Sequence, residues 1–74
     1  MSDNAARART KIHSHRRAVA EHIEKWRRYN QPHEKEFALK TIRNAQSQIA
    51  KLKDAHPSLR YDNASEDTWT PPRR

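Results

Sequence analysis

The chain has 74 residues, of which 32% are hydrophobic and 34% are charged, so it has enough apolar surface for one small domain and too little for a deep catalytic cleft. Its 16 Lys and Arg residues against 9 Asp and Glu residues give a net charge of +7, which favours an acidic partner, with nucleic acid first and an acidic protein surface second. The absence of cysteine excludes disulfides and thiolate metal sites, and the absence of glycine excludes phosphate-binding loops that need close backbone approach.

The N-terminal part of the chain is predicted to form an amphipathic helix. Its large apolar residues alternate in spacings of four and three residues, which places them on one helix face, if Arg16 is counted at the vacant place between Ile12 and Val19. These residues are Ile12, Val19, Ile23 and Trp26. Asp3 or Asn4 can cap the first turn. Residues 5 to 11 are almost all alanine or basic and bury nothing large, so we do not expect them to be helical without a partner.

The segment Asn30-Gln31-Pro32 predicts a corner between two helices. Asn30 tolerates the left-handed conformation that ends many helices, and Gln31 is kept out of the helical region by the proline that follows it. Pro32 suits the first turn of a new helix, where its missing N–H would be unpaired in any case. Because three adjacent residues each favour a stop or a start, a corner is predicted here and not a kink in one long helix.

A second amphipathic helix is predicted after the corner, with Phe37 and Leu39 widening the start of its apolar face. The rest of that face consists of Ala38, Ile42, Ala45, Ile49 and Leu52. This helix is expected to end near Ala55 or His56, because Pro57 cannot continue it.

The sequence therefore predicts an all-α protein. Residues 1–56 form an antiparallel hairpin of two amphipathic helices with its corner at 30–32, and residues 57–74, which hold three of the four prolines, form an irregular tail. The apolar seam is too small to make an isolated hairpin stable. We expect the additional contacts that a stable fold needs to come from one of three sources: a second copy that forms a four-helix bundle, a partner protein, or the tail folding back through Leu59, Tyr61 or Trp69.

Helical projection of the first helix places a row of basic side chains beside its apolar face, interrupted only by Glu24. The row consists of Arg9, His13, Arg16, Arg17, Arg27 and Arg28. Arginine is always charged and grips phosphate oxygens with two donors. This row is the predicted site for nucleic acid or a protein partner, and the alternative is a solvated flank that keeps a small protein in solution.

The remaining residues with chemical potential give weaker patterns. Trp69 stands in the polar segment EDTWTPPRR, so it either covers the hairpin or, like Tyr61, anchors a partner. The five histidines form no i, i+4 pair that could chelate a metal on one helix. No carboxylate pair and no nucleophile with a base appears. We therefore expect no metal, no cofactor and no enzymatic activity.

The arginine-rich segment NAARARTKIHSHRR, residues 4 to 17, resembles the arginine-rich helical segments of phage N-type antitermination proteins. Those segments also alternate Ala, Arg, Thr and His within a helix that grips RNA. In overall plan the chain is also similar to small plasmid-encoded helical-hairpin dimers that bind paired RNA loops. Both resemblances imply a small regulator that works on RNA or on the transcription machinery.

We expect a non-enzymatic transcription regulator, encoded by a phage or mobile element, that binds RNA polymerase, its transcript, or both. The alternative is an adaptor or inhibitor that docks its basic face on an acidic surface of a host enzyme without nucleic acid. A third hypothesis is a nonspecific nucleic-acid-packaging or assembly protein. No apolar run approaches the roughly 20 residues that span a bilayer and no signal-peptide core follows Met1, so the expected location is the cytoplasm, of a bacterial host cell for a phage protein.

Overall fold

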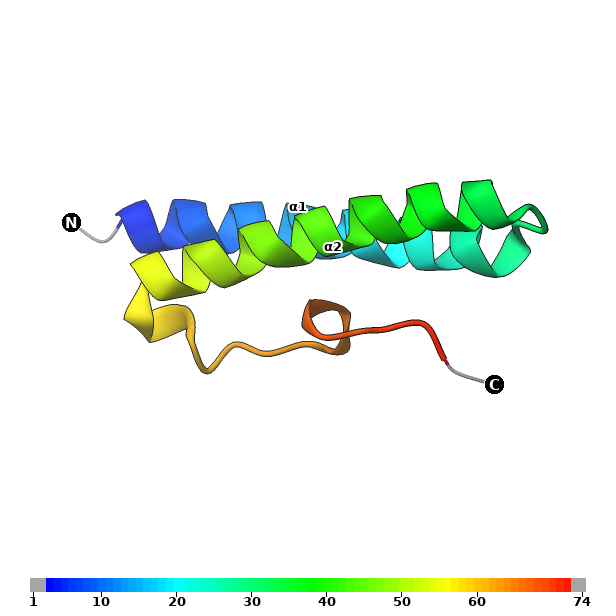
Figure 1. Cartoon of the computed structure of the whole chain (residues 1–74). Coiled ribbons are helices and arrows are strands. Elements are labelled where there is room, and N and C mark those ends of the chain that lie inside the picture. Colours follow the sequence, from blue (N-terminus) through cyan, green and yellow to red (C-terminus); the bar gives the residue numbers. More distant parts are fainter. Residues whose placement is uncertain (1–2, 73–74) are drawn as a thin grey trace.

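Two long antiparallel helices make up most of the chain in the computed structural model, which describes residues 3–72 (Figure 1). Helix α1 spans Asp3–Arg28 and helix α2 spans Pro32–Ala55. Two short 3₁₀ helices follow, η1 over Pro57–Leu59 and η2 over Ser65–Asp67, and residues 3–72 contain no strand. The predicted all-α hairpin is confirmed. No helix within residues 3–72 has the length and apolar character needed to cross a membrane.

The corner is built by an extended residue followed by proline. Tyr29 N–H still donates to the carbonyl of Lys25 at 2.9 Å, which completes the last turn of α1. Gln31 then takes extended angles, φ −83° and ψ 132°, and its carbonyl accepts the first N–H groups of α2. None of the described residues has a positive φ, so the left-handed conformation that Asn30 tolerates is not used. The extended Gln31 reverses the chain instead.

The hydrophobic core consists of two clusters, and each includes a residue of the tail. One cluster contains Ala8, Ile12, Ile49 and Leu59, with Leu52 packed against it. The other contains Val19, Ile23, Ile42 and Ala45, with Trp69 packed against it. The predicted seam is therefore present, and the tail supplies the contacts that the seam lacks.

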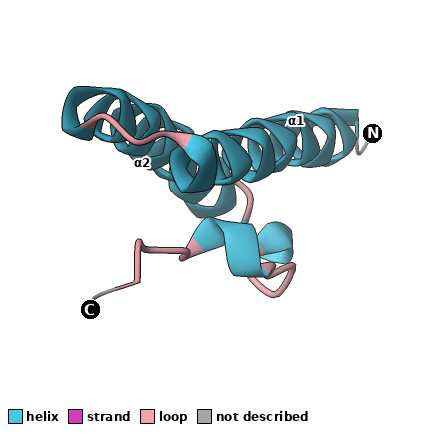
Figure 2. Ribbon diagram, turned by 90° about the vertical axis from the view of Figure 1, so that its right-hand side faces the viewer, coloured by secondary structure: helices cyan, strands magenta, loops and turns pink. Residues whose placement is uncertain are grey.

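The tail runs back along the hairpin on one side of both helices (Figures 1 and 2). Leu59 is completely buried, with 0% of its surface exposed, and its contact with Ala8 explains why the alanine-rich start of α1 is helical. Further along, the Gln46 side-chain amide donates to the carbonyls of Glu66 and Trp69 at 3.0 and 2.9 Å. The tail lacks long helices, as predicted, but it is docked along its length.

The aromatic residues near the corner pack against each other. Trp69 meets Trp26 edge to face, with ring centroids 5.7 Å apart. Lys35 lies over the ring of Trp26, with its Nζ 4.2 Å from the ring centroid, and this Nζ donates to the Trp26 carbonyl at 2.7 Å. These contacts fix the far end of the tail against the closed end of the hairpin.

The prediction that Phe37 widens the apolar seam is wrong, because 72% of its side chain is exposed. The buried residues of α2 are Ala38, Ile42, Ala45 and Ile49. At about 100° per residue, Phe37 lies roughly 140° around the helix from Ile42, so it points away from this face. Leu39 is half-buried, on the edge of α2 that lies near the tail.

Candidate nucleic-acid interface

The outer face of α1 is strongly basic because seven Lys and Arg side chains on it are exposed: Arg7, Arg9, Lys11, Arg17, Lys25, Arg27 and Arg28. Within residues 4–28 the only acidic side chains are Glu21 and Glu24, and residues 4–20 contain none. Regular alternation of charge would neutralise such a face. Residues 4–20 of α1 instead present positive charge with no acidic side chain among them.

Five of the six residues predicted for the basic row are exposed on this outer face: Arg9, His13, Arg17, Arg27 and Arg28. Arg27 donates to the Glu24 carboxylate at 3.1 Å, in an ion pair whose two side chains are both mostly exposed. An exposed pair of this kind contributes little to stability and is readily exchanged for another anion. Arg27 thus remains available to a phosphate.

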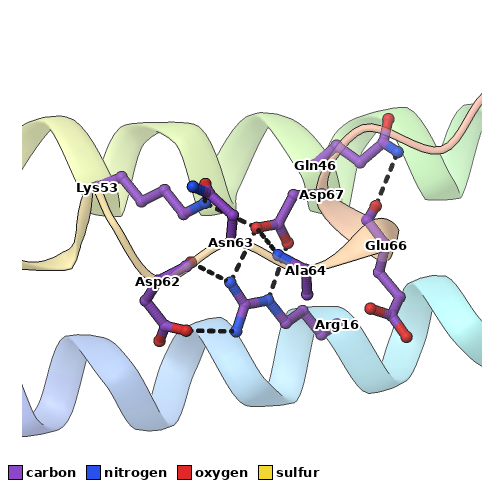
Figure 3. Close-up of polar contacts among 8 residues, drawn as sticks. All are labelled: Arg16, Gln46, Lys53, Asp62, Asn63, Ala64, Glu66 and Asp67. Carbon is purple, nitrogen blue, oxygen red and sulfur yellow. Dashed lines mark hydrogen bonds and ion pairs between the residues drawn. The ribbon is translucent and has the colours of Figure 1, made fainter.

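Arg16 is the exception. It was predicted as a binding residue, but it is buried. Only 10% of its side chain is exposed. Its Nε and Nη2 donate to the two carboxylate oxygens of Asp67, both at 2.8 Å, and Nη2 also donates to the Asp62 carbonyl at 2.6 Å (Figure 3). Arg16 occupies the vacant place between the two core clusters, where the tail covers it, so its donors are used inside the protein.

The Asp67 carboxylate is the centre of a polar cluster that joins the tail to both helices (Figure 3). Besides Arg16 of α1, it accepts a hydrogen bond from Lys53 Nζ of α2 at 2.7 Å and one from the Ala64 N–H at 3.2 Å. Lys53 Nζ also donates to the Asn63 side chain at 2.8 Å. Among the described residues, no buried side-chain nitrogen or oxygen lacks a partner.

The pKa values follow from this geometry. Burial by itself would raise the pKa of Asp67, but the hydrogen bonds from Arg16 and Lys53 outweigh it and lower the pKa to about 2. The hydrogen bond to Asp67 raises the pKa of Arg16 above its ordinary value, against the opposing effect of burial. Both groups therefore stay charged at neutral pH, and the cluster joins the tail to the hairpin through charged hydrogen bonds.

The cluster also determines where the positive charge is exposed. Three acidic residues of the tail, Asp62, Glu66 and Asp67, lie on the Arg16 side of α1 and act on the charge of that side chain. The tail carboxylates consequently neutralise Arg16 and Lys53, and within the described residues they form no ion pair with the exposed cations of α1.

Sequence reasoning missed Arg7, Lys11 and Lys25 as members of the exposed basic surface. The same helical projection that gave the predicted row places these three residues further around α1, on the side away from Arg16. The sequence pattern therefore contained these three residues, but only the structure shows that their side of α1 is exposed to solvent.

The two predicted partner anchors have different environments. Trp69 was predicted either to cover the hairpin or to anchor a partner. It is half-buried against the second core cluster, so it covers the hairpin. Tyr61 is 90% exposed.

Histidine and carboxylate side chains do not gather into a metal site within the described part of the chain. His13 is exposed, whereas His22 is half-buried and its Nδ1 lies 2.8 Å from the carbonyl of Ala18. Because Nδ1 donates in this contact, the neutral His22 ring has its free acceptor at Nε2.

A hollow of about 250 Å³ opens between the helices near the corner, and none of its lining residues comes from the tail. Phe37 forms part of its wall and also borders a second depression with Lys40 and Arg43 on the outer surface of α2. The exposed phenyl ring therefore separates two surface depressions that both contain cationic side chains.

Comparisons with protein-family models, curated proteins and solved structures gave no match to this chain.

Proposed function

We propose that this protein is a small non-enzymatic regulator of transcription, encoded by a phage or mobile element, that binds RNA through the outer face of α1. In this role the arginines of α1 hold the phosphate backbone of a transcript, close to RNA polymerase. The hairpin and the docked tail keep α1 helical so that its charges stay in a fixed row.

The observation that supports this proposal best is the separation of charge on α1. Residues 4–20 hold no acidic side chain, and four exposed basic residues lie among them: Arg7, Arg9, Lys11 and Arg17. The tail neutralises the one arginine of this segment that is buried. From Arg9 to Arg28 the helix is about 29 Å long at 1.5 Å per residue, which is enough to follow many phosphates of a nucleic acid.

The choice of RNA and transcription rests on the resemblance of residues 4 to 17 to N-type antitermination segments. In those segments the helix that carries the arginines is the part that grips RNA. Here the exposed members of the same stretch lie on one continuous helix, so they can contact a phosphate chain together.

A salt titration of RNA binding tests the proposal. If about five phosphates are contacted, the logarithm of the affinity should fall with the logarithm of salt with a slope of roughly −3.5, so affinity should drop about 100-fold between about 50 and 200 mM salt. The double variant Arg9→Ala/Arg17→Ala should reduce the slope by roughly 1.4.

The matched control is Lys51→Ala/Arg60→Ala, which removes the same charge from exposed positions outside α1. It should change the slope much less. Equal losses in the two double variants would show that net charge, and not the outer face of α1, governs binding.

The alternative of a protein adaptor is separated by capture from a bacterial lysate with and without nuclease. Retention of RNA polymerase only without nuclease supports binding through the transcript. A single host protein retained equally under both conditions, together with absence of RNA binding by the purified protein, would favour the adaptor.

A further inference from the structure

We infer that the hollow between Tyr29 and Phe37 is a stacking site for one base of a single-stranded RNA, whose phosphates follow a second row of cations along α1. This inference rests on the proposed function and adds to it the strand type, the route of the chain and a base-binding residue. Its starting point is Phe37, a large ring that is 72% exposed although the protein has little apolar surface to spare.

The walls of the hollow suit a planar ring. Phe37 and Ala38 of α2 form one side, and Tyr29 at the end of α1 forms the other. With about 250 Å³ of space the site is smaller than the roughly 300 to 1,000 Å³ of pockets for drug-sized ligands, which suits a single base. Aromatic side chains bind bases of any sequence because every base has a π face.

The polar groups of the hollow suit the edge of a base better than a phosphate. Glu34 and the Nε2 atom of His22 offer acceptors, and the Tyr29 hydroxyl can donate or accept. The Thr41 hydroxyl donates to the Phe37 carbonyl at 3.2 Å, so it can accept. One cation, Lys25, and one anion, Glu34, line the hollow, so its charge is close to balanced. A neutral ring is accommodated there more easily than a phosphate group.

Phosphates are instead accommodated on the strip of α1 that leads to the hollow. In helical projection, Arg7, Lys11 and Lys25 lie within an arc of about 40°, and Tyr29 lies in the same arc. All three cations are exposed, and no acidic residue shares this strip of residues 4–29. From Lys11 to Lys25 the strip is about 21 Å long. It ends at the hollow, since Lys25 lines both.

Further cations lie on the other side of the phenyl ring. Lys40 and Arg43 border the second depression next to Phe37, together with His33 and Glu36. A strand that leaves the hollow over Phe37 therefore meets positive charge again. An extended chain with a stacked base needs this combination of an aromatic platform and flanking cations, whereas a duplex keeps its bases paired and cannot insert one.

The test compares a single-stranded RNA of about 12 nucleotides with inorganic polyphosphate of about the same number of phosphates, a polyanion that has neither bases nor sugars. Binding of each is measured for the wild type and for Phe37→Ala, Phe37→Leu and Lys25→Gln. Circular dichroism verifies that each variant is folded, which the exposure of these two side chains favours.

Phe37→Ala is expected to weaken RNA binding by about 5- to 150-fold, to leave the salt slope unchanged and to leave polyphosphate binding unchanged. Phe37→Leu should show the same loss, because leucine keeps apolar surface but has no ring to stack. Lys25→Gln should weaken binding of both ligands and reduce the salt slope by about 0.7.

Three results would overturn the inference. The first is RNA binding by Phe37→Ala equal to that of the wild type, and the second is recovery of RNA binding by Phe37→Leu, which indicates that apolar contact and not ring stacking binds the base. The third is equal loss of RNA and polyphosphate in Phe37→Ala. In all three the wild type still binds RNA with a salt slope that depends on Arg17. A wild type that binds neither ligand would refute the proposed function as well.

Discussion

Replacement of Asp67 by Asn removes one charge from the cluster that joins the tail to both helices. The carboxylate accepts two hydrogen bonds from Arg16, one from Lys53 and one from the Ala64 N–H. Asparagine has nearly the same shape, but one of its two acceptor positions becomes a donor that faces other donors. Arg16 and Lys53 then lose their principal counter-ion in a place where little water reaches them.

The size of the effect follows from the pKa of Asp67, which falls from an ordinary 3.8 to about 2 in the folded protein. At about 1.4 kcal/mol for each tenfold change in proton affinity, the ionised group favours folding by roughly 2 kcal/mol. The folded pKa is the lower one, so this contribution is complete well above pH 3.8 and is lost as the pH falls through about 2. For a chain of this size the total stability is roughly 4 to 11 kcal/mol.

Urea unfolding, followed by circular dichroism and tryptophan fluorescence, measures this contribution at neutral and at acidic pH. At neutral pH, Asp67→Asn should lower the free energy of unfolding by about 2 to 4 kcal/mol. Its stability should also decrease less than that of the wild type on acidification, by roughly 2 kcal/mol. The matched control is Asp54→Asn, at an exposed position of α2 that makes no ion pair within the described residues.

An Asp67→Asn protein as stable as the Asp54→Asn protein at neutral pH would show that Asp67 does not stabilise the fold. Equal losses of stability by wild type and Asp67→Asn between neutral pH and pH 2 or below would show that Asp67 is not the group whose ionisation stabilises the fold.

Three further substitutions test how the tail and the corner contribute to the fold. Leu59→Ala should cost about 2 to 5 kcal/mol in urea unfolding, because the side chain is fully buried between the helix ends; an unchanged midpoint would mean that the tail is not docked. Trp69→Ala should cost about 2 to 3 kcal/mol and shift the emission of Trp26 to longer wavelength, since the edge-to-face contact is lost; an unaltered spectrum would contradict the packing. Phe37→Ser should change stability by less than about 0.5 kcal/mol, because the ring is mostly exposed; a large loss would show that Phe37 is part of the core.

The two helices and the corner could be predicted because their signals are local. The spacing of Ile12, Val19 and Ile23 by seven and four residues places these side chains on one helix face whatever they pack against. Pro32 excludes helical continuation for steric reasons that do not depend on the rest of the fold. The structure accordingly begins α2 at Pro32 and ends it at Ala55.

The candidate site could be predicted only in part, because exposure depends on what covers each face. Arg16 and Arg17 are adjacent in the sequence and alike in chemistry, yet one is held by Asp67 and the other faces solvent. No local pattern distinguishes them, since the carboxylate that binds Arg16 lies 51 positions away. Phe37 differs from these two arginines, because its position roughly 140° around α2 from Ile42 already points it away from the buried face, whatever its apolar character.

The sequence by itself determined that this chain forms two amphipathic helices and that one of them is rich in arginine, because backbone propensity, proline geometry and side-chain spacing act over a few residues. Only the tertiary structure decided that the tail completes the core, that its carboxylates neutralise Arg16 and Lys53, and that the remaining positive charge faces outward. The physical reason is that burial and charge neutralisation depend on contacts between distant segments, which form only when the whole chain has folded.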